Sequence, residues 1–483
     1  MVKIIRSVTN TPATAALVDN LHTKLLIDFI SASLTSTGQE EYYNTKAEQK
    51  ASLLQTHKPI LEKYREFYAL LLVSTINDIN KQIIVLNLLK SGKDVDNSVK
   101  EYENNLILQS LSNMQINRAY ATFELLAENK VNNKRSRELA RKFLESRKGY
   151  RYEFAKYKAK VKKIITHNHL YKKLEVWDFL FDKKKEFTDP LFSNYVKAKT
   201  DIEAAYKLPY SIAEGFAAYH KVDRKEFLEK IKDKMTDNEK QRLTTSAKEV
   251  GVNVGADWTQ GDLRKVLIYL YSLDRTPANM MDIIETKAKK EASFIPYKYE
   301  KVVAIVDNSA SSYGSEEKKF HPVASELANA FILKELSRDF TLLYTNPEGG
   351  RNIPQVGGET NLAIPLIKAL VQKPDVVFIL SDGYENVVAG TVAQVINAYK
   401  RQLDKDNKTM IIQLSSVFAA ESHAVRQLTE LVPNVGIRDT KQLSGALLLS
   451  TMQFKKDQTL LQFVTYLKER VKVIEHKNYL LEE

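Results

Sequence analysis

The sequence of 483 residues contains no cysteine and no apolar run long enough to cross a membrane. Without cysteine the chain has no disulfide, no thiolate nucleophile and no cysteine zinc site, which is typical of a reducing compartment. A membrane-spanning helix needs about 20 mostly apolar residues, and the first ten residues lack the apolar stretch of a signal peptide. We therefore expect a soluble protein of the cytoplasm.

The sequence also lacks the short motifs of common enzymes. It has no Gly-x-x-x-x-Gly-Lys-Ser/Thr phosphate loop, no Gly-x-Gly-x-x-Gly after a strand, no His-Glu-x-x-His and no Gly-x-Ser-x-Gly elbow. Serines that could be imagined as nucleophiles have no base partner that the sequence makes evident. We expect a protein that is not an enzyme.

Two kinds of apolar pattern divide the chain at about residue 296. Before it the spacing is helical, as in the stripe of residues 263–270, and strand-like alternation is scarce. After it, short runs rich in Val, Ile and Leu alternate with helical stretches, which is typical of a parallel sheet covered by helices on both faces. The predicted strands are Val302–Val306, Phe340–Tyr344, Val376–Leu380 and Met410–Leu414, and the predicted helices are Val323–Leu336, Ala363–Val371 and Val392–Arg401.

These patterns predict a multidomain protein. We expect residues 1–296 to form an all-α, HEAT-like helical array, possibly a ring, and residues 297–483 to form an α/β doubly wound domain with a C-terminal helix. No repeat of fixed period supports the array, so its architecture is inferred from the helical spacing alone.

The positive charge is concentrated in one segment. Residues 301–483 hold 21 basic and 21 acidic side chains, so the whole formal net charge of +12 belongs to the first 300 residues. Residues 134–163 carry thirteen basic side chains against Glu138, Glu145 and Glu153, a net charge of +10. Cations neutralise phosphates, and aromatic rings between them offer faces on which unpaired bases stack. The candidate RNA-binding residues are Lys134, Arg135, Arg137, Arg141, Lys142, Arg147, Lys148, Tyr150, Arg151, Lys156, Tyr157, Lys158 and Lys160.

Polar side chains stand where the predicted strands end. Asp307, Ser309 and Ser311 follow the first strand, Thr360 lies in a Gly-Gly-Glu-Thr loop before a helix, and Asp382 follows the strand that ends at Leu380. A hard divalent cation takes about six oxygen ligands, and Mg²⁺ keeps several of them as water. Hydroxyls from two loops with two carboxylates behind them meet this requirement, and they leave a position open for an acidic group from outside. The cofactor we expect is Mg²⁺ or Mn²⁺.

These five residues resemble, element by element, the metal-ion-dependent adhesion site of von Willebrand factor A domains. The resemblance implies direct coordination by Ser309, Ser311 and Thr360, with Asp307 and Asp382 acting largely through water. The alternative is that the first loop merely turns the chain, that Thr360 caps a helix and that Asp382-Gly383 makes a turn.

Longer runs resemble the Ro autoantigen family. They are residues 358–365 and 375–401 in the C-terminal part and, more faintly, 206–228 and 153–169 in the helical part. The family has a ring of helices, the TROVE module, before a von Willebrand factor A domain. It often has Gly-Gly-Thr where Gly358, Glu359 and Thr360 stand, and Thr360 still fits the ligand position. The resemblance implies a ribonucleoprotein scaffold that binds small structured RNA or single-stranded RNA ends.

Other interpretations of the helical part stay open. A charge run is often a solvated helix face, and its aromatics can be core residues at helical spacing. His167 and His169 are then loop or core residues rather than ligands. The second functional hypothesis is a protein–protein adaptor that uses the metal site without RNA, for example as a partner of an AAA+ ATPase.

Overall fold

The computed structural model describes two compact units. Its described residues are 46–74, 76–170, 175–259, 261–273, 276–295, 298–314, 319–346, 353–416, 427–429, 431–437 and 440–454, with Leu26, Phe29, Ile30, Ser33, Leu467, Lys468 and Val471. The sheet unit comprises Gly261–Glu469 with Met1–Tyr64 and Ser74–Asn77. The helical unit comprises Arg65–Val73 and Asp78–Gln260 with Arg470–Glu483.

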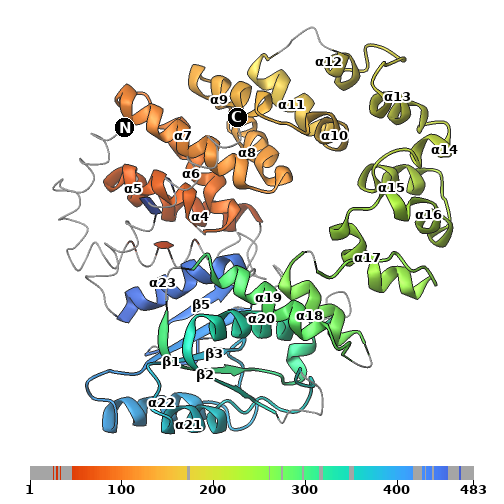
Figure 1. The fold of residues 1–483 in the computed structure, drawn as a ribbon. Helices are drawn as coiled ribbons and strands as arrows, with labels where there is room; N and C mark the ends of the chain where they lie inside the picture. The colour runs from red at the N-terminus through yellow and green to blue at the C-terminus, as the bar shows by residue number, and fades with distance from the viewer. Residues whose placement is uncertain are drawn as a thin grey trace. The chain divides into compact units, whose positions relative to one another are not determined.

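A parallel sheet of five strands in the order β2-β1-β3-β4-β5 forms the centre of the sheet unit (Figure 1). The strand order reverses beside β1, and ligands of doubly wound sheets bind at such a point beyond the carboxyl ends of the strands. The strands are β1 (Tyr299–Val306), β2 (Ser337–Tyr344), β3 (Val376–Leu380), β4 (Met410–Ser416) and β5 (Asn434–Ile437).

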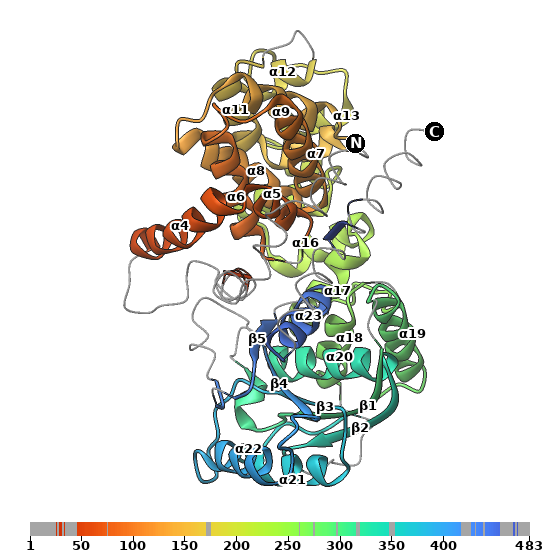
Figure 2. The same cartoon turned by 90° about the vertical axis from the view of Figure 1, so that its left-hand side faces the viewer.

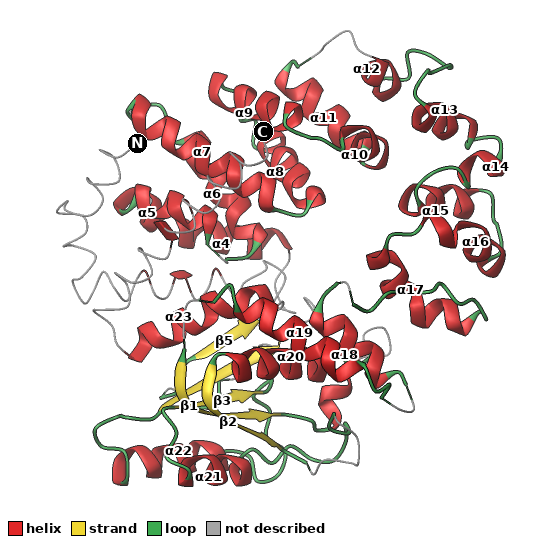
Figure 3. Ribbon diagram, in the orientation of Figure 1, coloured by secondary structure: helices red, strands yellow, loops and turns green. Residues whose placement is uncertain are grey.

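Helices cover both faces of this sheet (Figure 3). One face contacts α20 (His321–Glu335) and α23 (Leu443–Phe454). The other contacts α21 (Ala363–Val371), which packs against α22 (Thr391–Gln402). Both faces of β1 and β3 are buried, which explains their continuous apolar sequence.

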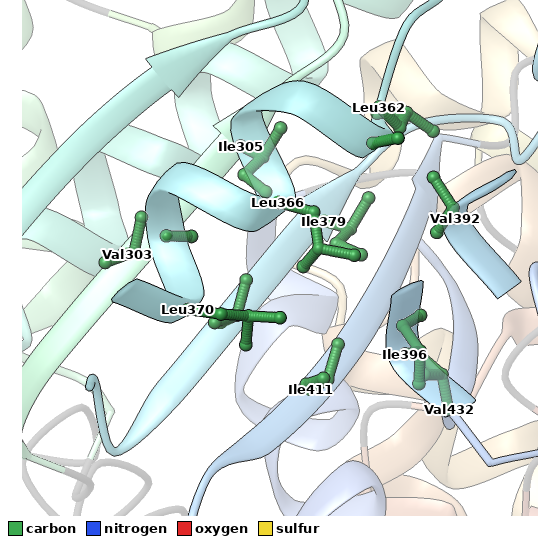
Figure 4. Packing of buried hydrophobic residues seen from close by; sticks show 13 residues of the cluster. Val303, Ile305, Leu362, Leu366, Leu370, Ile379, Val392, Ile396, Ile411 and Val432 are labelled. Atoms are coloured by element: carbon green, nitrogen blue, oxygen red, sulfur yellow. The ribbon is translucent and has the colours of Figure 1, made fainter. Parts of the chain in front are cut away.

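The core between the sheet and α21 and α22 consists of aliphatic side chains (Figure 4). Val303 and Ile305 of β1 and Ile379 of β3 lie under Leu366 of α21, and all four are fully buried. Truncating such a leucine to alanine costs about 2–5 kcal/mol. This packing holds the carboxyl ends of β1 and β3 in place next to each other.

The remaining helices precede the sheet in the chain. Several start at an Asp or Asn whose side chain accepts a hydrogen bond from a backbone N–H of the first turn; Asn133 also forms a capping box with Ser136. They are α4 (Lys46–Lys63), α5 (Arg65–Leu70), α6 (Asp78–Lys90), α7 (Asn97–Asn113), α8 (Ile116–Glu128), α9 (Lys134–Glu145), α10 (Tyr150–Lys156), α11 (Lys158–Asn168), α12 (Glu175–Leu180), α13 (Pro190–Lys197), α14 (Ile202–Ala205), α15 (Tyr210–Tyr219), α16 (Arg224–Ile231), α17 (Asp237–Glu249), α18 (Leu263–Tyr271) and α19 (Met280–Ala292). Figure 2 shows them from a second side.

The predicted fold class is confirmed, since helices precede a parallel sheet with helices on both faces. All four predicted strands are present, and β5 is an addition. It has only four residues, too few for a periodic signal. The helices α18 and α19 pack against α20 in the sheet unit, although they precede the boundary that we expected at residues 296 and 297. The domain limits expected from the sequence, 1–296 and 297–483, therefore remain a proposal. None of the helices described is long and apolar enough to cross a membrane.

Candidate functional site

The predicted metal ligands lie on three loops that hydrogen bonds join at the carboxyl ends of β1 and β3. Ala310 N donates to Gly358 O at 3.1 Å, and Gly357 N donates to the carbonyl of Asn308 at 2.9 Å. Asn386 N, on the loop after Asp382, donates to Thr360 O at 3.2 Å. The structure therefore brings the loops of Ser309 and Ser311, of Thr360 and of Asp382 together, as the sequence predicted.

Asp307 anchors this arrangement. Its carboxylate is 1% exposed and accepts hydrogen bonds from Ser309 N at 3.0 Å, Thr345 Oγ1 at 3.2 Å and Ser381 Oγ at 2.9 Å. Three donors from three segments satisfy a charge whose burial alone would be costly. Because these donors occupy the carboxylate, Asp307 is suited to orient the loops and water molecules rather than to provide the main contact with an ion.

The hydroxyls are arranged differently. Ser309 Oγ and Ser311 Oγ lie 3.0 Å apart. Thr360 is fully buried, and its Oγ1 has no hydrogen-bond partner among the described residues. A buried hydroxyl without a partner costs about 1–3 kcal/mol. Two neighbouring hydroxyls and one orphaned hydroxyl are the donor set that a hard cation completes, so the residues present fit Mg²⁺ or Mn²⁺.

The site is buried on one side and open on the other. Ser309 is buried, whereas Ser311 is exposed and Asp382 is half-buried. Asp382 Oδ1 accepts a hydrogen bond from Tyr384 N at 3.0 Å, which fixes the carboxylate in its turn. No three His, Cys, Asp or Glu side chains of the described residues lie close enough to hold a metal by themselves. A cation here therefore depends on the hydroxyls.

Glu326 of α20 is a third carboxyl of this site, and the sequence analysis missed it. The side chain is 2% exposed, and its Oε2 has no hydrogen-bond partner among the described residues. Burial, reinforced by the negative charges of Asp307 and Asp382, raises the pKa of Glu326 well above its usual value. The signal was present, since Glu326 is a lone acidic residue inside the apolar run of residues 323–333.

Two further residues shape the loops without having been predicted. Asn308 is fully buried; its amide donates to Gln355 O at 2.8 Å and its Oδ1 accepts from Asn346 N at 2.9 Å. Gly358 has a φ of +76°, and a Cβ there would overlap the side chain of Asn346. Glycine is therefore required at position 358, where the loop of Thr360 passes Asn346.

The candidate RNA-binding residues lie in the helical unit, on consecutive helices. The helix α9 carries Lys134, Arg135, Arg137, Arg141 and Lys142; the next turn carries Arg147 and Lys148; α10 carries Tyr150, Arg151 and Lys156; Tyr157 and α11 with Lys158 and Lys160 follow. Whether RNA contacts them stays a prediction.

Among the ion pairs of the described residues, four of these cations have acidic partners outside residues 134–163, and three pair with glutamates inside that segment. Arg135 is 12% exposed and pairs with the buried Glu103 at 2.8 Å, so it is a structural residue. By contrast, Arg137 and Lys156 form no ion pair with a carboxylate of the described residues. The paired cations are Arg135, Arg141, Lys142, Arg147, Arg151, Lys158 and Lys160. Exposed pairs contribute about 0–1 kcal/mol, so a phosphate can replace the carboxylate at little cost.

The aromatic side chains of the segment serve partly as core. Phe154 is buried, and the ring of Tyr150 packs against it at 5.7 Å. Tyr157 packs against Tyr120 at 5.6 Å, while Lys156 Nζ lies 5.5 Å from the centre of the Tyr157 ring. Both ring pairs are T-shaped, and a cation also lies over the ring of each tyrosine, Arg151 over Tyr150 and Lys156 over Tyr157. Part of each ring is therefore already occupied by the protein.

The two histidines have structural roles. His167 Nε2 lies 2.9 Å from the carbonyl of Val131, and His169 ends α11 in the left-handed conformation with a φ of +53°. These contacts agree with the interpretation of both as loop or core residues.

Comparisons with known proteins found similarity to solved structures but not to known sequences. No family model matches the sequence, and no curated protein matches it. The chain is similar to the crystal structure of the Deinococcus radiodurans RO (RSR) protein, with 10% sequence identity and a TM-score of 0.46. The similarity covers 87% of this chain and 99% of that one. That structure bears the name of the family that the motifs resemble. With a TM-score this low, the functions proposed below rest on the residues of this chain.

Proposed function

We propose that the protein is a Ro-like RNA-binding scaffold without catalytic activity. Its sheet unit docks a protein partner through a divalent cation, and its helical unit binds RNA. The observation that carries the proposal is the buried hydroxyl of Thr360, which has no hydrogen-bond partner among the described residues and stands on a loop that is hydrogen-bonded to the loop of Ser309 and Ser311. A hydroxyl is kept in such a place at a cost unless a ligand completes it.

In this proposal Ser309, Ser311 and Thr360 hold Mg²⁺ or Mn²⁺ directly, and Asp307 and Asp382 hold it through water. Few of the direct ligands carry a charge, so the bound ion would stay electrophilic and attract a carboxylate. The partner is therefore a protein that presents an Asp or Glu side chain. The exposure of Ser311 and Asp382 leaves that side of the site accessible.

RNA binding rests on the charge of the helical unit. Small structured RNA or single-stranded RNA ends would lie along α9, α10 and α11, with their phosphates on the lysines and arginines. Arg137 and Lys156 are exposed and have no carboxylate partner among the described residues, so they are among the cations available for phosphates. The expected location is the cytoplasm.

The alternative is an adaptor that uses the metal site without RNA. The observation in its favour is that seven of the thirteen basic side chains in the charged segment pair with carboxylates. The absorbance ratio at 260 and 280 nm of the purified full-length protein separates the two functions. Nucleic acid that copurifies and is lost on ribonuclease treatment supports the scaffold, and clean protein supports the adaptor.

The metal proposal is tested by Thr360→Val, which keeps the shape of the side chain and removes only the hydroxyl. If the hydroxyl is a metal ligand, titration calorimetry with Mn²⁺ shows binding to the wild type and little or none to the variant. The metal-free variant should then melt at the same or a higher temperature, because an orphaned hydroxyl has been removed. Unchanged Mn²⁺ affinity together with a lower melting temperature would show a structural hydroxyl instead.

A further inference from the structure

The helical unit contains a cavity of about 530 Å³ between α10, α13 and α15. This volume lies within the range of about 300–1,000 Å³ that is usual for small-ligand sites. The lining combines aromatic rings, two lysines and one serine, contributed by Lys156, Tyr195, Lys199, Ser211, Phe216 and Tyr219. We propose that this cavity, here called the α15 pocket, binds one unpaired nucleotide of an RNA strand. The proposal rests on RNA binding by the helical unit.

The aromatic side of the pocket suits a base. Tyr195 and Phe216 meet edge to face with ring centres 5.1 Å apart, which fixes both rings. Tyr219 is 72% exposed at the rim, although a ring of that size is usually buried. Burial, and the charge of Asp182, raise the pKa of Tyr195, so its ring stays neutral. A flat base can stack on such rings whatever its sequence identity.

The polar side suits the phosphate and the sugar of the same nucleotide. Lys156 Nζ donates to Tyr152 Oη at 3.1 Å, and Tyr152 Oη lies 2.6 Å from Ser211 Oγ. Because Tyr152 Oη accepts the hydrogen bond from Lys156, the hydroxyl hydrogen of Tyr152 can be donated to Ser211 Oγ. The Ser211 hydroxyl is then left to donate to a ligand.

The lysines of the pocket carry charge that is not fully neutralised. Partial burial lowers the pKa of Lys156, but the hydrogen bond to Tyr152 and nearby negative groups outweigh it, and the net pKa is raised. Lys199 lies 3.8 Å from Asp182, which already pairs with Lys158 at 2.6 Å. One carboxylate thus faces two lysines, and a phosphate can take up the excess positive charge.

Gly215 gives a direct way to close the pocket. It lies in α15 on the lining, and a Cβ built there meets no atom within 4 Å. Gly215→Leu therefore places an apolar side chain in the pocket from a position where its Cβ has free space, and replacing a helical glycine does not weaken the helix. Ala218→Leu is the matched control, because Ala218 is exposed on the same helix and does not line the pocket.

The experiment measures binding of fluorescent hexauridylate, and of an all-abasic strand of the same length, to the full-length protein. We expect Gly215→Leu to weaken hexauridylate binding by about 5- to 150-fold, the range for loss of one stacked base. Ala218→Leu should bind as the wild type does, and the two variants should not differ on the abasic strand. Lys156→Gln should weaken both strands, and Lys156→Arg should restore most of the affinity.

The outcomes separate the pocket from the proposed function. If Gly215→Leu and Ala218→Leu bind hexauridylate equally well, the pocket proposal is wrong and RNA binding stands. If the wild type binds neither this strand nor structured RNA, both proposals fail. UMP, titrated in parallel, distinguishes the source of the nucleotide: binding of UMP that Gly215→Leu abolishes, without binding of any strand, would assign the pocket to a free nucleotide and overturn the RNA assignment.

Discussion

The candidate metal site of the sheet unit and the charged segment of the helical unit were both predicted from short patterns, but the two patterns translate into structure differently. In the sheet unit, residues that stand far apart in the sequence converge because parallel strands end at one edge. Ser309 and Thr360 are 51 positions apart, yet hydrogen bonds join their loops. In the helical unit, residues close in sequence are spread over three helices and a turn.

This difference shows which patterns can be interpreted from sequence alone. A motif whose members are tied to strand ends predicts a geometry, because the topology determines where they lie. A run of charge predicts only composition, because several of its partners come from elsewhere in the chain. Glu103, Glu124, Asp182 and Asp189 all lie outside residues 134–163 and neutralise cations within it. The local net charge of +10 therefore overstates the charge that RNA would meet.

The largest expected effect concerns metal binding by the sheet unit. Replacing both Ser309 and Ser311 by alanine should reduce Mn²⁺ affinity by at least about 100-fold, above the 10- to 100-fold typical of residues that only orient ligands. The fold should persist, because these serines lie on loops. Calorimetry measures the affinity and circular dichroism the fold.

Ser312→Ala is the matched control for this experiment. Its hydroxyl donates to the carbonyl of Asp307 at 2.8 Å, so its loss should cost about 0.5–1.5 kcal/mol of stability and leave metal binding intact. The opposite result, with metal binding dependent on Ser312 and unaffected by the double change, would rule out the proposed ligand set.

Partner binding should show the next largest effect. Asp382→Ala removes a carboxylate that orients the loop and bound water, and should weaken capture of a carboxylate-bearing partner by about 10- to 100-fold. Pull-downs in Mg²⁺ and in EDTA measure this effect. Asp406→Ala, at a position 76% exposed in the same unit, is the control. Equal recovery of the partner in EDTA and in Mg²⁺ would show that the interaction does not require the ion.

In the helical unit, the next test compares cations that have no carboxylate partner among the described residues with cations that are ion-paired. The double change of Arg137 and Lys156 to Gln should reduce the magnitude of the salt slope for single strands by about 1.4, which is 0.7 for each phosphate contact. The matched change of Arg141 and Lys160, both ion-paired, should reduce it less. Affinity is measured at several salt concentrations for both.

Replacing Arg137, Arg141, Lys156 and Lys160 together by Glu should have the largest effect on the salt slope. Its magnitude should fall by about 3 if every one of the four side chains contacts a phosphate. A folded charge-reversed protein that binds RNA with wild-type affinity and slope would identify the segment as a solvated face.

Much of the fold, and the meeting of the three loops that carry the proposed ligands, could be predicted for reasons visible in particular residues. The strand runs are buried on both faces and so stay apolar throughout, which makes β1 and β3 easy to recognise. Glu326 was missed because a buried carboxyl has no local signature apart from its apolar neighbours. The burial of Asn308 and the ion pairs of the helical unit depend on tertiary contacts, which no local pattern encodes.

Glu326 offers a smaller test within the sheet unit. Because its folded pKa is raised, the unfolded chain loses this proton at lower pH than the folded protein does. The metal-free protein should therefore lose stability as pH rises from the usual glutamate pKa through the raised one. Glu326→Gln should remove this loss, raising the melting temperature in EDTA at pH 8 and hardly at pH 4. A variant that is less stable than the wild type at pH 8 and equally stable at pH 4 would show that the folded protein holds Glu326 in its charged form.

The smallest expected effect concerns the tyrosines of the charged segment. Tyr150 packs against Phe154 and Tyr157 against Tyr120, so each ring already contacts another ring. Stacking on a fully available ring contributes about 1–3 kcal/mol per base, and a ring that is partly buried should contribute less. Replacing both by leucine, which keeps most of the packing, should therefore lower the affinity for hexauridylate by less than about fivefold. The salt slope should stay unchanged, because stacking releases few counterions. If the double change instead weakens binding as much as Gly215→Leu does, then bases stack on Tyr150 and Tyr157 as well as in the α15 pocket. The charged segment would then bind the bases of the strand and not only its phosphates.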